Sequence, residues 1–171
     1  MIDQNDLSWV DTPEHGWVTM RLPHMVLEQS FVCGDSSGER LIVRYYKAEA
    51  DQSLRAKVLL GPAAQGPPGH AHGGSIAALL DEAMGGAGWM AGHPSVAADL
   101  AVRFRTMLPL GTRVVIEASV VAVDGRKVRA RAVLRGDQGT LYAEGDALFI
   151  KIDPSRFGSL TAEAARAAVN P

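Results

Sequence analysis

The sequence predicts an α+β fold in which an antiparallel β-sheet wraps around one long central helix. A run from about Gly74 to Ala91 is apolar nearly all round, which is typical of a buried helix. Four segments after it alternate apolar and polar residues, as strands with one buried face do. Such a sheet needs a cover, and this helix is the only long apolar element available.

The composition is that of an ordinary globular protein. The 171 residues suffice for one domain with a sizeable core, and 47% of them are hydrophobic. A net charge of −2 gives no general attraction to nucleic acid or membranes, so neither is expected as a partner. Cys33 is the only cysteine, which excludes an intrachain disulfide. The start lacks a secretory signal pattern and no stretch is suited to span a bilayer, so we expect a cytoplasmic location.

The chain is expected to divide into three parts. Residues 1–35 form an N-terminal extension, residues 36–153 form the main domain, and residues 154–171 form a tail with a short helix from Leu160 to Val169. A Pro/Gly-rich loop over 61–69 breaks the structure just ahead of the central helix.

Strands are predicted on both sides of the helix from β-rich composition and alternation. On the strand beginning at Thr112 the apolar face is expected to include Ala122. On the last strand Leu141 is expected on the apolar face and Tyr142 on the polar face. The turn at Asp124-Gly125 is a typical hairpin connection. The predicted strands span 31–33, 40–46, 54–60, 99–106, 112–124, 128–135 and 141–149.

Three glycines lie inside the predicted helix. Gly85, Gly86 and Gly88 each lower helix propensity by about 1 kcal/mol relative to alanine, so we expect them to allow close approach of helix and sheet. A sheet wrapped around one buried helix is the hotdog architecture, and this is the fold that the residues predict.

The helix also carries two adjacent carboxylates, Asp81 and Glu82. A carboxylate on a buried helix is costly unless it is paired, hydrogen-bonded or used in chemistry. The start of the same helix, at Gly73 and Gly74, offers unpaired backbone N–H groups to an oxyanion. An oxyanion site and a buried carboxylate on one helix suggest acyl-transfer chemistry.

The spacing of these groups indicates that a joint site needs a second copy of the chain. His72 and Asp81 lie ~13 Å apart along one helix, at a rise of 1.5 Å per residue. They therefore cannot both touch one reacting carbonyl within one subunit. If they work together, a two-fold dimer with antiparallel central helices must bring one copy's Asp81 to the other's helix start.

The segment His72-Gly73-Gly74, followed after six residues by Asp81, resembles the signature of the PaaI-type hotdog-fold acyl-CoA thioesterases. The flanking segments 66–74, 125–127, 141–144 and 149–151 are similar to the mammalian thioesterase-superfamily branch in particular. The similarity extends over roughly residues 40–153. His-Gly-Gly alone is a weak motif, and the spacing, the helix and the strand order make it specific.

The resemblance implies hydrolysis of an acyl-CoA thioester, with no metal and no redox cofactor, coenzyme A being part of the substrate. Asp81 would activate a water molecule or attack the carbonyl itself, and an N–H at Gly73 or Gly74 would stabilise the oxyanion. His72 would orient the loop or the thioester. The substrate-binding candidates are Gln65, Glu82 and, for the phosphates of coenzyme A, Arg103, Arg105, Arg126 and Lys127.

The resemblance further implies a homodimer, with two dimers assembling into a homotetramer. The acyl group would lie in an apolar tunnel between subunits. Some relatives place Thr or Ser where the strand after the helix begins, to help hold the attacking water, whereas Ala97 here has no hydroxyl. The side chains that could line the tunnel are Met84, Trp89, Met90 and Phe104.

Two other functions remain open, namely a hotdog acyl-thioester hydratase or dehydratase, and a non-catalytic acyl-CoA-binding module. Simpler roles for single residues also remain. Asp81 could pair with an arginine across an interface, His72 could only cap the helix, and Arg103 and Arg105 could form the wet face of a strand. A metal site is not expected, because no carboxylate or cysteine stands at a recognisable ligand spacing around the histidines.

Overall fold

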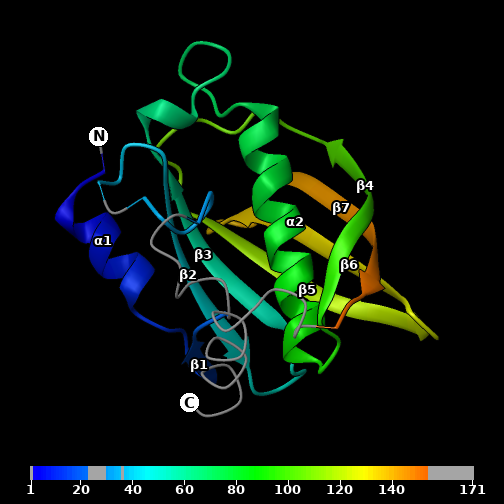
Figure 1. Cartoon of the computed structure of the whole chain (residues 1–171). Coiled ribbons are helices and arrows are strands. Elements are labelled where there is room, and N and C mark those ends of the chain that lie inside the picture. The colour runs from blue at the N-terminus through cyan, green and yellow to red at the C-terminus, as the bar shows by residue number, and fades with distance from the viewer. Residues whose placement is uncertain (1, 23–29, 36, 154–171) are drawn as a thin grey trace.

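The computed structural model describes residues 2–22, 30–35 and 37–153, so the predicted helix at 160–169 lies outside the described residues (Figure 1). One antiparallel sheet has the strand order β1-β2-β3-β5-β6-β7-β4, and β4 forms one of its edges. Within the described ranges, no helix is long and apolar enough to cross a membrane. The elements are α1 (Gln4–Asp11), β1 (Trp17–Met20), β2 (Leu41–Ala48), β3 (Leu54–Leu60), the 3-10 helix η2 (Pro62–Ala64), α2 (Gly73–Met90), β4 (Ser95–Phe104), β5 (Val114–Asp124), β6 (Lys127–Gly136) and β7 (Leu141–Lys151).

The long helix α2 lies across the inner face of the sheet, which confirms the predicted hotdog fold (Figure 1). It begins one residue earlier than predicted. Leu79, Leu80, Ala83 and Met84 are at most 1% exposed, because they face the sheet. Burial of such side chains contributes roughly 1.5–3 kcal/mol each for the larger ones, so this packing is the main stabilising contribution of the helix.

Glycines permit the close approach of α2 to the sheet, as predicted. A Cβ atom added at Gly86 would lie 2.7 Å from a methyl group of Leu22 and 2.9 Å from one of Leu54 on β3. From the opposite side, Gly145 of β7 leaves room for Met84, whose terminal methyl would lie 3.0 Å from an added Cβ. The helix can sit this low only because both surfaces lack side chains where they meet.

Two irregularities in the sheet make the predicted alternation wrong locally. The register shifts around Val121, so Ala122 pairs with Arg129 and lies on the outer face rather than the apolar face. A second shift near Leu141 puts that residue on the outer face and turns Tyr142 into the core, where it is 9% exposed. One extra residue in a strand reverses the faces beyond it, which strict alternation does not anticipate.

The predicted short strand at 31–33 is also wrong, because these residues form a turn. The Gly34 N–H donates to the Ser30 carbonyl at 2.8 Å, and the Cys33 N–H donates to Ser30 Oγ at 3.2 Å. The backbone is thus satisfied locally instead of in the sheet. The turn brings Phe31 and Val32 against the cavity beside α2.

The N-terminal extension packs onto the sheet. Strand β1 pairs with β2, and α1 lies on the outer face of β2 and β3, opposite α2. There Val10 contacts Ile42 and Leu59 in a small core of its own. Because both faces of β2 and β3 are covered, these strands are buried almost continuously.

Lys57 on β3 binds the N-terminal extension through its buried ammonium group. Its side chain is buried, and its Nζ donates to the carbonyls of Trp9 at 3.2 Å and Thr12 at 2.7 Å. The same ammonium pairs with Glu14 at 2.6 Å and lies 4.9 Å from the centre of the Trp9 ring. A buried ammonium needs such partners, so Lys57 fixes where the extension crosses the sheet.

The contact at Gly86 predicts the sign of a substitution. Alanine is the better helix former by about 1 kcal/mol, yet Gly86→Ala should lower the free energy of unfolding by about 1–3 kcal/mol, because its methyl group would collide with two leucines. Urea denaturation monitored by circular dichroism measures this. A Gly86→Ala protein as stable as the wild type would contradict the close packing described here.

Candidate active site

The candidate residues on α2 line two separate cavities. The first, called the Gly73 cavity, has a volume of about 310 Å³ and is lined by residues that include His70, Gly73, Phe104 and Arg105. The second, called the Asp81 cavity, has a volume of about 420 Å³ and includes Asp81 and Glu82 from the middle of the helix. The two cavities share no lining residue, so one subunit does not bring the helix start and the carboxylates together.

At the helix start, His72 is the N-cap of α2. Its Nδ1 accepts a hydrogen bond from the Gly74 N–H at 2.8 Å, which is the capping role considered for it from the sequence. A Cβ at position 74 would lie 2.8 Å from the same nitrogen, so the cap requires glycine there. Of the two predicted oxyanion donors, the Gly74 N–H is therefore engaged. The Gly73 N–H has no acceptor among the described residues and borders the Gly73 cavity.

Gln65 stands in the loop that leads to this helix. Its Oε1 accepts a hydrogen bond from the Gly69 N–H at 3.1 Å, and its backbone bridges to Ala71. These contacts close the Pro/Gly-rich loop on itself. In the structure Gln65 thus shapes the entrance of α2, and its predicted contact with substrate stays a prediction.

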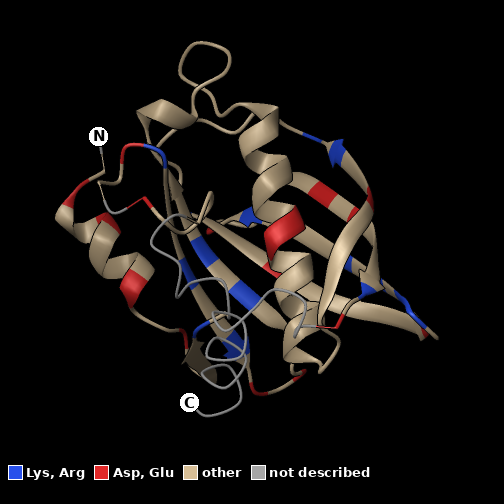
Figure 2. Cartoon of the chain, in the orientation of Figure 1, with Lys and Arg blue, Asp and Glu red and all other residues tan. Residues whose placement is uncertain are grey.

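Asp81 is half-buried on an otherwise almost uncharged helix (Figure 2). Its Oδ1 is buried and has no hydrogen-bond partner in the described part of the chain. Burial, followed by the negative charge of neighbouring Glu82, raises the pKa of the Asp81 carboxyl. An unpaired buried acceptor costs about 1–3 kcal/mol, so the fold keeps this carboxylate at the expense of stability.

Glu82 points to different partners. Its Oε1 accepts hydrogen bonds from the Tyr45 hydroxyl at 2.7 Å and from the Cys33 thiol at 2.8 Å. Burial and the Glu82 charge raise the pKa of Cys33 to about 12, and burial raises the pKa of Tyr45 as well. Both donors thus stay protonated. Sequence reasoning missed Cys33 and Tyr45, because the segments that carry them meet α2 only in the folded protein.

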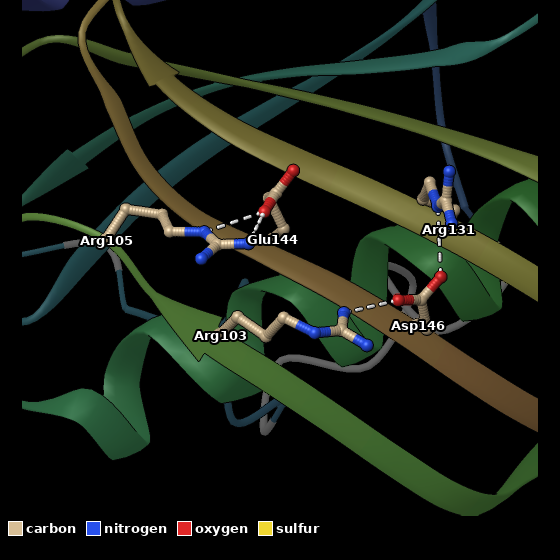
Figure 3. Close-up of polar contacts among 5 residues, drawn as sticks. All are labelled: Arg103, Arg105, Arg131, Glu144 and Asp146. Atoms are coloured by element: carbon tan, nitrogen blue, oxygen red, sulfur yellow. Dashed lines mark hydrogen bonds and ion pairs between the residues drawn. The ribbon is translucent and has the colours of Figure 1, made fainter.

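The arginines after the helix lie on the outer face of the sheet (Figure 3). Arg103 pairs with Asp146 at 2.5 Å, and Arg105 binds Glu144 through two nitrogens at 2.7 and 2.8 Å. Arg131 also donates to Asp146, at 3.0 Å. A phosphate group would have to compete with these carboxylates, so the contacts of Arg103 and Arg105 with coenzyme A stay a prediction.

Arg126 and Lys127 lie elsewhere, at the hairpin between β5 and β6. Arg126 reaches the Lys151 carbonyl at 3.4 Å, and Lys151 pairs with Ser95 at the start of β4. The four cations proposed from the sequence therefore fall into two pairs at opposite ends of β4. In the part of the chain that is described, no three His, Cys, Asp or Glu side chains are arranged to hold a metal ion.

The antiparallel sheet wrapped around α2 defines a hotdog fold. Its candidate site has a glycine-rich helix start in one cavity and a carboxylate in the other. Residues 68–143 match the family model described as thioesterase superfamily. Over these residues the chain is similar to the thioesterase superfamily, and it resembles in particular the branch that includes the acyl-coenzyme A thioesterases THEM4 and THEM5.

The THEM4 acyl-coenzyme A thioesterase of Xenopus laevis is 38% identical over 125 residues, which are 70% of this chain and 54% of that protein. The chain spans about half the length of this relative. A crystal structure of a thioesterase superfamily protein is 33% identical, with a TM-score of 0.61 over 64% of this chain and 56% of that one. A hypothetical thioesterase of Streptococcus pneumoniae, crystallised with coenzyme A, shares the fold at 14% identity, with a TM-score of 0.57 over 58% of this chain and 78% of that one.

The hydrogen bond from Cys33 to Glu82 predicts an unreactive thiol. With a pKa of about 12 instead of the ordinary 9.0, the native protein at pH 8 should hold ~1000-fold fewer thiolates than the unfolded chain. Alkylation with iodoacetamide, followed by mass spectrometry with and without urea, measures the ratio. Glu82→Gln should lower the Cys33 pKa and speed native labelling. Equal rates for native and unfolded wild type would contradict the buried contact.

Proposed function

We propose that this protein hydrolyses acyl-CoA thioesters, converting R–CO–S–CoA and water into R–COOH and HS–CoA. The observation that carries the proposal is the carboxylate of Asp81, which borders a cavity with one oxygen buried and unpaired. The names of the THEM4 and THEM5 relatives and the family match support the same reaction.

Asp81 is suited to the chemistry of this step. Its oxygen is already desolvated, and its raised pKa makes the ionised form a stronger base than an exposed carboxylate. It would take a proton from water as that water attacks the carbonyl carbon. The alternative is direct attack by Asp81 to form an acyl-enzyme anhydride that water then cleaves. In the first route Asp81 passes the proton on to the departing thiolate, and in the second the water that cleaves the anhydride supplies it. In either route the C–S bond breaks and HS–CoA is released.

The negative charge that develops on the carbonyl oxygen needs a donor, and the Gly73 N–H is the proposed one. Because this donor lies in the other cavity, the proposal includes a second subunit. A full site would combine Asp81 of one copy with Gly73 of its partner, giving two equivalent sites in a two-fold dimer.

Strand β4 is the edge through which we expect the two copies to pair. Its far side has no neighbouring strand in the sheet, and it carries exposed apolar side chains. Val96 is 46% exposed, Leu100 is 37% exposed and Phe104 is 54% exposed. A long apolar edge strand is an aggregation hazard unless something covers it, which supports an edge-to-edge dimer here.

Antiparallel pairing of two β4 strands would also join the two cavities. Val96 and Ala97, at the start of β4, line the Asp81 cavity, and Phe104, at its end, lines the Gly73 cavity. A two-fold axis near the middle of β4 places the start of one strand opposite the end of the other. Each Asp81 cavity would then meet the partner's Gly73 cavity. Assembly of two such dimers into a tetramer remains an expectation.

Coenzyme A would extend from the joined cavities toward cationic side chains. Arg105 lines the Gly73 cavity, so it is the first of the four candidates to consider. Its two hydrogen bonds to Oε2 of Glu144 would have to be exchanged for a phosphate contact. The coenzyme A bound to the structural neighbour from Streptococcus pneumoniae supports this class of ligand for the fold.

Asp81→Asn should lower kcat for thioester hydrolysis by at least about 100-fold, because the amide keeps the size of the side chain but cannot accept the proton. Release of coenzyme A from short, long and aryl acyl-CoAs, detected with a thiol reagent, measures the rate. Glu82→Gln is the matched comparison on the neighbouring residue. Collapse in Glu82→Gln with full activity in Asp81→Asn would move the catalytic role to Glu82.

The same assay separates the alternatives. Hydration of an enoyl thioester without cleavage would support a hydratase. Tight binding of coenzyme A with no turnover of any thioester would support a non-catalytic binding module.

Mixing two inactive variants tests whether the site is shared. Asp81→Asn lacks the carboxylate, and Gly73→Val fills the Gly73 cavity, where even a Cβ would lie 3.2 Å from Phe104. A random mixture after subunit exchange should recover about a quarter of wild-type activity, because half the dimers are mixed and each has one intact site. Light scattering checks that each variant is dimeric. No recovery despite proven exchange would contradict a site built across the interface.

A further inference from the structure

The Asp81 cavity runs along one stripe of α2. The residues that α2 contributes follow helical spacing, from Ala78 through Asp81 and Gly85 to Trp89. Ala78 and Gly85 have little or no side chain, so the floor of the cavity is low on either side of the carboxylate. Glu82 and Gly86 line the cavity as well, and Trp89 is the one aromatic side chain that the helix places in it among the described residues.

Other elements form the walls of this cavity. Val96 and Ala97 of β4 and Phe149 of β7 line it, together with Phe31 and Val32 of the turn before β2. All of these wall residues are apolar. Apart from Asp81, Glu82 and Ser95, the lining is therefore suited to a hydrocarbon chain. A Cβ at Gly85 would lie 3.3 Å from the Phe149 ring, so the floor and this wall are in near contact.

Trp89 is held in place at the C-terminal end of the stripe. Its Nε1 donates to the Ser95 carbonyl at 3.2 Å, at the point where β4 begins. The hydrogen bond restrains the indole, which therefore acts as a fixed wall rather than as a mobile side chain. The catalytic carboxylate and this wall stand two helical turns apart on the same stripe.

From this arrangement we infer that Trp89 closes the acyl end of the Asp81 cavity and limits the substrate to short and medium straight-chain acyl groups. The inference rests on the proposed thioesterase function. Trp89 stands eight positions after Asp81, which is about 12 Å along the helix axis. An extended chain advances about 1.2 Å per bond, so about ten bonds fit. The attacking water and the reacting carbonyl occupy part of this length, which leaves room for an acyl group of about six to eight carbons.

The test is a chain-length profile of kcat/KM with butanoyl-, hexanoyl-, octanoyl-, decanoyl- and dodecanoyl-CoA. For the wild type, kcat/KM should fall by at least about tenfold between octanoyl- and dodecanoyl-CoA, because one methylene group too many already lowers it by about that much in a closed pocket. Trp89→Leu removes both the indole and its hydrogen bond. It should raise the ratio of kcat/KM for dodecanoyl-CoA to kcat/KM for octanoyl-CoA by at least about tenfold.

Gly85→Ala should move the profile the opposite way. Its methyl group raises the floor against Phe149, so the preferred acyl group becomes shorter by about two carbons, while the better helix former keeps the protein folded. Met90→Ala is the control. The sequence offered Met90 as a tunnel residue, but the structure places it next to Trp89 on α2 and outside the lining of both cavities. This variant should keep the wild-type chain-length profile even if its free energy of unfolding is lower.

The outcomes are distinct. Opposite shifts for Trp89→Leu and Gly85→Ala, with Met90→Ala unmoved, support the inference. A wild-type preference for dodecanoyl-CoA, or a profile that Trp89→Leu leaves unchanged, overturns the inference while thioester hydrolysis itself stands. If wild type cleaves none of these thioesters or the aryl ones, the proposed function fails and the chain-length inference fails with it.

Discussion

The structure depends on how closely one apolar helix can approach the sheet that wraps around it. Gly86 on α2 and Gly145 on β7 remove the side chains that would hold the two surfaces apart. Leu80 and Met84 are fully buried between the two surfaces. The low position of the helix places Asp81 in a cavity lined by residues of β4 and β7, and it brings Glu82 within hydrogen-bonding distance of Tyr45 on β2. A helix held further out would leave Asp81 in solvent, where its pKa would be ordinary.

The same burial gives the neighbouring carboxylates different environments. Glu82 receives hydrogen bonds from Tyr45 and Cys33, so its charge is stabilised by the protein. Asp81 keeps one buried oxygen without such a bond. Two groups of the same chemical type are thereby separated into a fixed one and one available for reaction. The charge of Glu82 also contributes to the raised pKa of Asp81.

The N-terminal extension and the edge strand give the two ends of the sheet opposite properties. At the β2–β3 end, α1 and the buried Lys57 cover the outer face, and β1 adds a further strand. At the other end, β4 is left with exposed apolar side chains and no neighbour beyond it. A second copy is expected at the β4 end, which is also where both cavities open.

The sequence predicts the central helix, the meander after it and the resemblance to the thioesterase superfamily, because periodicity and the glycine-histidine spacing before Asp81 are local signals. It also indicated that Gly73 and Asp81 are too far apart on one helix to act together. Which residues surround each of them depends on how the strands and the N-terminal segments pack against the helix, and this is seen only in the folded protein. The bulge near Val121 and the shift that buries Tyr142 reverse faces without a local mark in the sequence. Likewise Cys33 and Tyr45 acquire their roles from contacts with Glu82 on a distant segment, and such contacts depend on packing rather than on spacing along the chain.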